Sequence, residues 1–238
     1  MRGQLRIVSL PMNTRGILPV NEMFYSLQGE AHWTGTPAVF VRFQGCRVGC
    51  AFCDTKHTWL LDGSLQAPTE AMLEKTSDDA TYARMWPLEI AANIRNRWPS
   101  ARHVVLTGGE PADYDLLSLC ELLARDGLSI QLETSGTAPL RVSDGTWVTV
   151  SPKIEMPGGL AVLPEVLGRA NEIKHPTSTK HHLDQLQRLL ACGWHSPDAE
   201  IWLQPLSQHP LATERCIEWC KHYGYRLSLQ THKYMMIR

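Results

Sequence analysis

Three cysteines, Cys46, Cys50 and Cys53, stand within eight residues in the stretch FQGCRVGCAFCDTKHTW. A disulfide between any two of them would close a very small, strained ring and leave the third thiol over. Structural zinc takes four ligands, usually as two paired sets. Iron–sulfur clusters take thiolates, and a four-iron cluster usually takes four of them. Three cysteines would leave one iron without a protein ligand, and an open coordination position is where metals do chemistry.

The remaining cysteines predict no second site of this kind. Cys216 and Cys220 are four residues apart in a helical pattern, so both would face one side of an amphipathic helix as core residues. We extend the same interpretation to Cys120 and Cys192. Seven cysteines, an odd number with uneven spacing, do not fit a secreted disulfide framework.

The elements that would position the cysteine loop follow a regular rhythm after residue 100. Six apolar, β-branched runs each lead into a polar cluster: RHVVL into Thr107, LSIQL into Glu133, WVTV into Ser151, ANEI into Lys174, EIWL into Gln204, and YRLSLQ into Thr231. Helical patterns occupy 114–127 and the regions near 183–192 and 212–223. Because ligands gather at the carboxyl ends of parallel strands, we expect these polar clusters to share one rim.

The predicted fold is α/β, an incomplete (β/α) barrel. Together with AVFVRFQG before the cysteines, the runs make about seven strands, and the helices number fewer than the eight of a complete barrel. Clear pattern begins only near residue 19, so residues 1–18 are predicted to be an extension and 19–238 a single core domain. The stretch 60–86 is polar and poorly periodic, which predicts an insertion packed beside the barrel.

Composition excludes several classes of partner. The formal net charge is -1, from 23 basic and 24 acidic residues with no long basic run, which argues against direct capture of nucleic acid. No apolar run approaches the length of a membrane span. The opening apolar stretch is short and broken by Pro11, unlike a signal peptide. We therefore expect a cytoplasmic protein.

The segment CRVGCAFC, with Phe52 just before the third cysteine, resembles the signature of the radical S-adenosylmethionine (SAM) superfamily. The resemblance implies that the three thiolates hold a four-iron, four-sulfur cluster whose fourth iron is chelated by SAM. It also implies that the incomplete barrel is of the radical SAM type.

Longer motifs are similar to those of the 7-carboxy-7-deazaguanine synthase family, which serves queuosine biosynthesis. They run from residue 21 to the end and are NEMFYSLQGE, GTPAVFVRFQGC, CDTKHTW, ARHVVLTGGEP, QLETSGT, WVTVSPK, RANEIKHP and SLQTHKY. The implied reaction converts 6-carboxy-5,6,7,8-tetrahydropterin to 7-carboxy-7-deazaguanine with release of ammonia. SAM would supply a 5′-deoxyadenosyl radical and be regenerated, and magnesium would assist.

The family resemblance also implies roles for individual residues. SAM would be contacted by Phe52, Cys53, Asp54, Gly109, Ser135, Ser151, Lys153 and Gln204, and magnesium by Thr55. Substrate would be contacted by Leu27, Gln28, Gly29, Glu30, Arg42, Thr107, His232 and Arg238. Some family members end in proline where this chain ends in Arg238.

The chemistry of three of these residues fits the roles so implied. The guanidinium fork of Arg42 suits a substrate carboxylate, with a surface ion pair as the other interpretation. Glu30 can accept hydrogen bonds from a guanidine-like pterin edge. Thr55 offers a hard oxygen of the kind that magnesium prefers.

Two other classes of function compete with the synthase. One is a radical SAM activase that makes a glycyl radical in a partner protein, and such activases often carry extra clusters. The other is a non-enzymatic iron–sulfur redox module, which would leave the polar strand ends without purpose. For the synthase the resemblance implies a homodimer, and an unidentified reductant protein must supply electrons.

Overall fold

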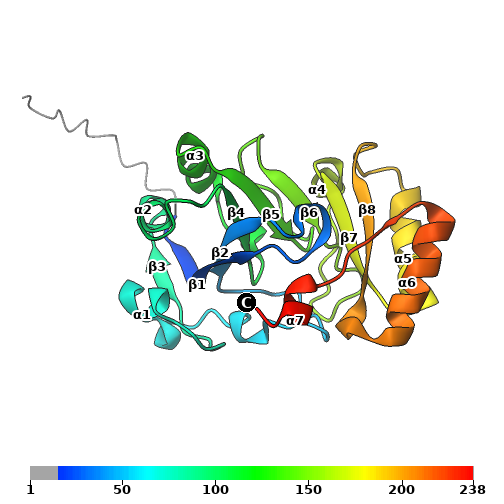
Figure 1. The fold of residues 1–238 in the computed structure, drawn as a ribbon, viewed down its shortest axis with the longest axis horizontal. Coiled ribbons are helices and arrows are strands. Elements are labelled where there is room, and N and C mark those ends of the chain that lie inside the picture. Colours follow the sequence, from blue (N-terminus) through cyan, green and yellow to red (C-terminus); the bar gives the residue numbers. More distant parts are fainter. Residues whose placement is uncertain (1–15, 238) are drawn as a thin grey trace, which may run out of the picture.

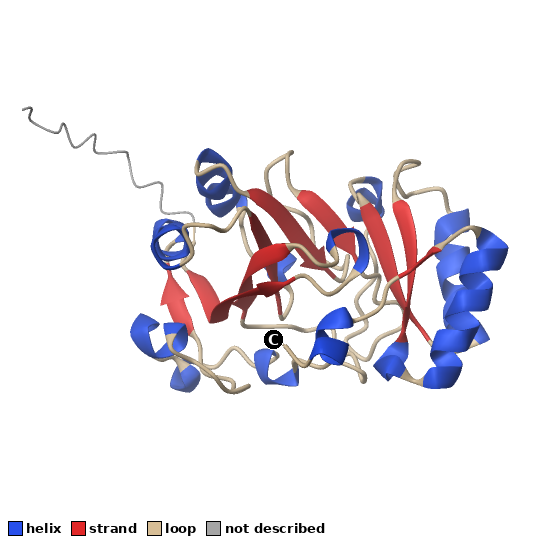
Figure 2. Cartoon of the chain, in the orientation of Figure 1, coloured by secondary structure: helices blue, strands red, loops and turns tan. Residues whose placement is uncertain are grey.

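A nine-stranded sheet forms the centre of the molecule in the computed structural model, which describes residues 16–237 (Figures 1 and 2). The strands are β1 (Leu18–Leu27), β2 (Pro37–Phe43), β3 (Ala83–Met85), β4 (His103–Gly108), β5 (Ser129–Thr134), β6 (Trp147–Val150), β7 (Glu172–Thr177), β8 (Glu200–Pro205) and β9 (Arg226–Leu227). They are ordered β3-β1-β2-β4-β5-β6-β7-β8-β9. Because the sheet has free edges at β3 and β9, the predicted incomplete barrel is confirmed.

The described residues form seven helices, and most of them cover the outer face of the sheet. They are α1 (Thr69–Leu73), α2 (Pro87–Arg97), α3 (Leu117–Arg125), α4 (Pro164–Gly168), α5 (Lys180–Ala191), α6 (Pro210–Tyr223) and α7 (Thr231–Met235). In Figure 1, α2 and α3 lie at one end of the sheet and α5 and α6 at the other. The three helical patterns predicted from the sequence correspond to α3, α5 and α6.

Each parallel strand sends alternate side chains outward and inward, as the two-residue period of a strand requires. On β4, Val104 and Leu106 pack outward into an apolar cluster with α2 and α3, while Val105 and Thr107 face the interior pocket. On β6, Val148 and Val150 join a second cluster with α4, α5 and α6. The outward faces therefore supply the apolar core, and the inward faces are available for a site.

Two strands at one edge were not predicted. β1 runs antiparallel to β2 and has a register shift between Val20 and Glu22, and β3 pairs antiparallel with β1. Residues 18–23 of β1 are all buried, so the alternation that marks a half-buried strand is missing there. The seven remaining strands pair in parallel, which agrees with the predicted number.

The stretch 60–86 contributes to the sheet edge through α1 and β3. Tyr82 and Met85 are fully buried although their surroundings in the sequence are polar. At the other edge, the predicted strand YRLSLQ is wrong in length, because only Arg226–Leu227 is strand. Ser228 departs from the ladder and its hydroxyl binds Gln204 and the backbone of Ala31.

The prediction for the four remaining cysteines is correct for three of them. Cys120, Cys216 and Cys220 are buried, and the Cys216 thiol lies 3.6 Å from the Thr177 carbonyl oxygen. Cys192 is exposed, so its assignment to the core was wrong. It follows the last turn of α5, where the helical pattern no longer determines which side of the chain faces the core.

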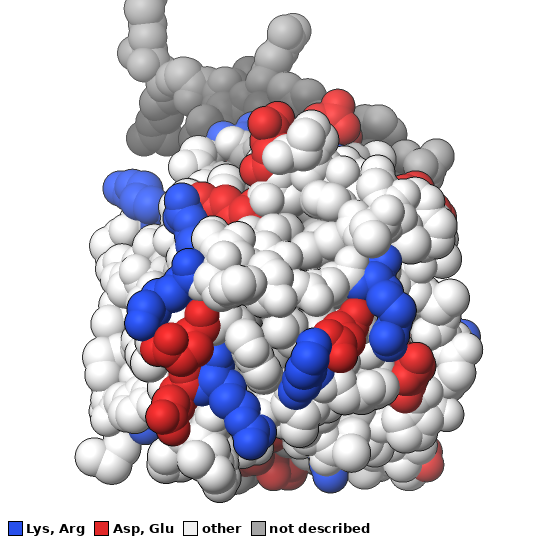
Figure 3. All heavy atoms as spheres, turned by 90° about the vertical axis from the view of Figure 1, so that its right-hand side faces the viewer, with Lys and Arg blue, Asp and Glu red and all other residues white. Residues whose placement is uncertain are grey.

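The face formed by α5 and α6 carries basic and acidic side chains intermixed (Figure 3). Ion pairs on these helices include Lys180 with Asp184 and Lys221 with Glu218. Within residues 16–237, no helix has the length and apolar character needed to cross a membrane.

Candidate active site

A pocket of about 560 Å³ opens at the carboxyl ends of the parallel strands. Every predicted site residue within 16–237 lines it, from Leu27 in β1 to His232 in α7. Arg238 lies outside the described residues. The polar clusters that end six predicted strands therefore do meet at one rim, as their shared position at the carboxyl ends required.

The cysteine loop is held by backbone contacts on two sides. The Gly45 and Cys46 amides donate to the carbonyl oxygens of Thr58 and Trp59, at 2.7 and 3.0 Å. On the other side, the Gly158 amide donates to Val48 at 3.0 Å, and a Cβ on Gly158 would lie 2.1 Å from the Arg47 carbonyl oxygen. The loop after β6 can therefore pack on the cysteine loop only with glycine at this position.

The three thiols fit a cluster better than a single metal ion. All three line the pocket and none forms a disulfide. Among the described residues, no group of three His, Cys, Asp or Glu side chains is placed to hold one ion. Burial raises the pKa of Cys46 to about 11, so cluster assembly would displace its proton. The Trp59 indole N–H donates to the Cys53 sulfur at 3.4 Å, as it could to a cluster thiolate.

Glycines at the end of β4 allow two backbones to approach closely. A Cβ on Gly108, whose φ is +127°, would lie 2.2 Å from the Phe43 nitrogen, and one on Gly109 would lie 2.1 Å from the Gly45 carbonyl oxygen. These glycines let the β4 loop pack directly under the cysteine loop. The resemblance implies only that Gly109 contacts SAM, and the structure adds this packing requirement.

The predicted SAM side of the pocket rests on a buried carboxylate. Glu110 is 2% exposed and accepts hydrogen bonds from the Thr134 hydroxyl and the Ser135 amide, at 2.6 and 2.8 Å. It thereby ties the loop after β4 to the end of β5. Nearby, Lys153 donates to the carbonyl oxygen and hydroxyl of Ser151, and burial lowers its pKa.

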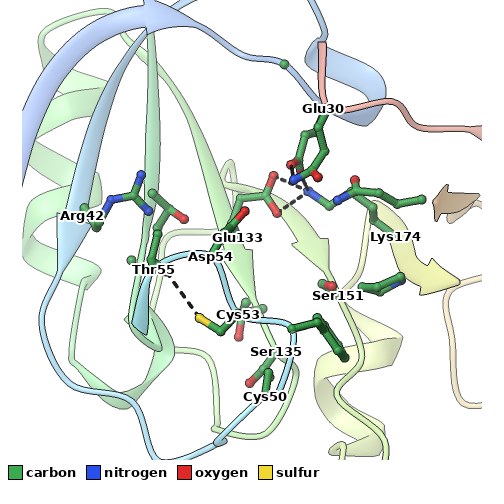
Figure 4. Close-up of a pocket in the computed structure, with 18 of the residues that line it drawn as sticks. Glu30, Arg42, Cys50, Cys53, Asp54, Thr55, Glu133, Ser135, Ser151 and Lys174 are labelled. Atoms are coloured by element: carbon green, nitrogen blue, oxygen red, sulfur yellow. Dashed lines mark hydrogen bonds and ion pairs between the residues drawn. The ribbon is translucent and has the colours of Figure 1, made fainter. Parts of the chain in front are cut away.

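The predicted substrate side contains three charged groups in contact (Figure 4). The Lys174 ammonium lies 2.5 Å from Glu30 and 2.8 Å from Glu133. Burial acts to raise the pKa of Glu30, but the ammonium and two hydrogen bonds outweigh it and lower that pKa to about 2. Burial dominates at Glu133 and raises its pKa to about 7. The two carboxyl groups therefore differ in charge near neutral pH.

Arg42 lies on the inward face of β2, across the pocket from this group (Figure 4). Its Nε donates to Glu22 at 2.6 Å, and its guanidinium lies 5.9 Å from the centre of the Phe24 ring. The Arg42 side chain is only 17% exposed, so the ion pair is not at the surface. Glu22 binds the Nε of the Arg42 guanidinium, so the two terminal nitrogens remain for a ligand in the pocket that Arg42 lines.

The C-terminal helix α7 sits on the loop after β1. The Thr231 amide donates to the Gly29 carbonyl oxygen at 2.9 Å, and a Cβ on Gly29 would lie 2.2 Å from the His232 ring. Lys233 reaches the cysteine loop and pairs with Asp54 at 3.0 Å. The four side chains of the tail YMMI are exposed and do not line the pocket, so they do not shield it from water.

Sequence reasoning did not assign roles to Glu133, Lys174, Gln230 or Trp59. Glu133 belongs to a strand in which polar and apolar residues alternate, SIQLET, and that alternation was an available signal. The strand of Lys174, EIKHPT, does not alternate in this way. Gln230 donates to Glu30 at 2.8 Å, a contact between residues 200 positions apart that no local pattern indicates.

Comparison with known proteins places these features in a family. The model of the radical SAM superfamily matches residues 40–153. A 7-carboxy-7-deazaguanine synthase of Escherichia coli K12 is 48% identical over 92% of this chain and 98% of its own length. One from Synechocystis is 35% identical over 92% and 93%. A crystal structure of QueE from Escherichia coli superposes with a TM-score of 0.86 at 47% identity, covering 89% of this chain and 93% of that one.

Proposed function

Because the chain belongs to the 7-carboxy-7-deazaguanine synthase family of radical SAM enzymes, we propose that it makes this product for queuosine biosynthesis. The substrate would be 6-carboxy-5,6,7,8-tetrahydropterin, and ammonia would be released. The function is that of an enzyme, because the whole length of its relatives is matched and the pocket contains the parts that the reaction needs.

The single observation that carries the proposal is the union of two different sites in one pocket. Three free cysteines line one part of the pocket, and the half-buried Arg42 and a pair of carboxyl groups line two other sides of it (Figure 4). An activase would have to admit a protein segment, and a redox module would need no such polar lining. A small ring that carries one carboxylate and several N–H donors matches the charged groups around the lining.

Cys46, Cys50 and Cys53 would hold a four-iron, four-sulfur cluster, which with SAM supplies the 5′-deoxyadenosyl radical. The SAM contacts would come from Phe52, Cys53, Asp54, Gly109, Ser135, Ser151, Lys153 and Gln204, all of which line the pocket. Glycine, hydroxyl and ammonium groups of this kind suit the amino and carboxylate groups of the methionine part.

The pterin would be oriented between Arg42 and the carboxyl groups. Arg42 would bind the carboxylate, and Thr107 and His232 would contact the ring together with Leu27, Gln28, Gly29 and Glu30. Thr55 would contribute an oxygen to magnesium, which keeps few protein ligands and otherwise binds substrate and water. Its hydroxyl lies 3.6 Å from the Cys53 sulfur, so the oxygen that it would offer to magnesium is beside the cysteine loop.

The proposal extends to the setting of the enzyme. We propose that it acts in the cytoplasm as a homodimer, with an electron-donating protein as its partner and no direct contact with nucleic acid. Sedimentation of the cluster-loaded enzyme would test the dimer. Full activity of a protein that sediments as a monomer would contradict it.

The function is tested by anaerobic incubation of cluster-loaded protein with SAM, a chemical reductant, magnesium and the carboxypterin. Mass spectrometry should detect 7-carboxy-7-deazaguanine, and ammonia should appear in equal amount. Formation of 5′-deoxyadenosine with no change in the pterin would favour the activase. Absence of 5′-deoxyadenosine from cluster-loaded protein would favour the redox module.

A further inference from the structure

Lys174 is placed to organise other side chains and cannot itself bind a ligand. Its ammonium lies 2.5 Å from Glu30 Oε2 and 2.8 and 2.9 Å from the two oxygens of Glu133. The side chain is only 4% exposed. A lysine ammonium has three N–H donors, and these three contacts use all of them. Lys174 therefore acts on the pocket by fixing the positions of the two carboxyl groups.

Each carboxyl group also accepts a hydrogen bond from a side-chain amide. Gln230 donates to Glu30 Oε1 at 2.8 Å, and Gln131 donates to Glu133 Oε1 at 3.1 Å. The Gln28 amide lies between Gln131 and Glu133, at 3.0 and 3.5 Å. A carboxylate can accept about four hydrogen bonds, so Glu133 Oε2 and Glu30 Oε2 each keep accepting capacity beyond Lys174.

The charges of this group balance only while Glu133 holds a proton. Two carboxyl groups face one ammonium, and the other charged or titratable groups that act on them are Glu172 from deeper in β7, Lys153 and His232. Burial of a charge without a partner is costly, so this end of the pocket gains from a ligand edge that donates hydrogen bonds or carries positive charge.

We propose that Lys174 is a positioning residue that fixes Glu30 and Glu133 as a pair of acceptors and so makes this end of the pocket select a ring edge with several N–H donors. The inference rests on the proposed function, since the amino-pyrimidinone edge of a pterin is such an edge. It adds a residue that no resemblance assigned, and it assigns the selection to a pair of carboxyl groups rather than to Glu30 alone.

The test compares Lys174→Met with Glu133→Gln and with the double variant Glu133→Gln/Lys174→Met. Removal of the ammonium should lower kcat/KM for the carboxypterin roughly 10- to 100-fold, mainly through KM, as expected for a lost charged hydrogen bond. Formation of 5′-deoxyadenosine from SAM without substrate should stay within about twofold, because Lys174 makes no contact with the cysteine loop. The double variant removes the formal charges of both residues. Glu133→Gln alone keeps the ion pair between Lys174 and Glu30, so it should fold even if the two Lys174 variants do not.

The pH profile separates positioning from a purely structural role. The kcat/KM of the wild type reports ionisation of the free enzyme. It should fall as pH drops through about 7, where Glu133 gains a proton and loses an acceptor. This fall is the acid limb of the pH profile. Because Lys174 lowers the pKa of Glu133, Lys174→Met should move this limb to higher pH. Glu133→Gln and the double variant should lack the limb.

Two outcomes would overturn the inference. One is a folded Lys174→Met or double variant with the KM of the wild type. The other is an acid limb that stays in place when Lys174 or Glu133 is replaced. Failure of the wild type to convert the pterin would instead refute the proposed function, so the two failures are distinguishable.

Discussion

Replacement of Arg42 tests the part of the proposal that concerns substrate recognition. Arg42→Met removes the guanidinium whose Nε binds Glu22 at 2.6 Å and whose terminal nitrogens are available to a ligand. A hydrogen bond to a charged group contributes about 1.5–3 kcal/mol, which corresponds to a rise in KM of roughly 10- to 150-fold. The cluster and the SAM contacts lie on other elements, so cleavage of SAM without substrate should persist.

The same replacement has a cost for folding that must be separated from recognition. It breaks the ion pair between Arg42 and Glu22, whose side chain is 4% exposed, and breaking a buried pair costs up to about 3–5 kcal/mol. The double variant Glu22→Gln/Arg42→Met removes both charges and should recover much of the free energy of unfolding. Urea denaturation of both variants measures this recovery, and the elevated KM should be common to both.

A substrate analogue without the carboxylate makes the assay specific. The wild type should bind tetrahydropterin more weakly than the carboxypterin by a factor similar to the rise in KM, whereas Arg42→Met should bind the two alike. The reasoning is refuted if the stable double variant keeps the KM of the wild type. It is also refuted if SAM cleavage and pterin turnover fall together, because Arg42 would then support the cluster or the fold.

Three further predictions concern the cluster, the tail and the pH dependence of stability. Replacement of Cys46, Cys50 or Cys53 by alanine should abolish the iron content and brown colour of anaerobically loaded protein. The control Cys216→Ala should keep both, and loss of iron from it would contradict the assignment of Cys216 to the core. Deletion of residues 233–238 removes the contact of Lys233 with Asp54, so pterin turnover should fall at normal iron content, and full activity of the truncated protein would count against this role of α7. Burial raises the pKa of Glu133 from 4.5 to about 7, so the folded state binds the extra proton and loses up to about 3 kcal/mol of stability as pH rises between these values. Denaturation of Glu133→Gln should lack this component, and identical pH dependence of the two proteins would show that Glu133 titrates normally.

Local patterns in the sequence were sufficient to predict the parallel strands and the helices α3, α5 and α6, but not α2. β-branched runs such as RHVVL and WVTV are buried on one side by helices and on the other by the pocket, so they read as apolar runs with a polar end. The shared rim followed from the rule that carboxyl ends of parallel strands meet. It was therefore possible to predict that the site residues at the strand ends lie together at one rim.

What the sequence could not predict depends on contacts between distant segments. β3 is strand because it pairs with β1, more than 60 residues earlier, and its own composition gives no signal. The same holds for Glu22, which is opposite Arg42 only because a register shift in β1 aligns them. Cys192 was misplaced because a helical period indicates a buried face only while the helix continues.

The inward face of the sheet carries polar and charged side chains that contribute little to the stability of the fold. Buried ion pairs are often no more stabilising than apolar residues of similar size, and beside Lys174 and Glu30 the second carboxyl group, Glu133, ionises only at the cost that its raised pKa reflects. Stability comes instead from the outward faces, whose valine, leucine and isoleucine side chains form the two apolar clusters under the helices. An interior this polar is maintained at a cost to the fold, and that cost is reduced when a ligand with complementary donors and a carboxylate fills the space between Arg42 and Lys174. Substrate binding and stability of the pocket should therefore be coupled through these buried charges.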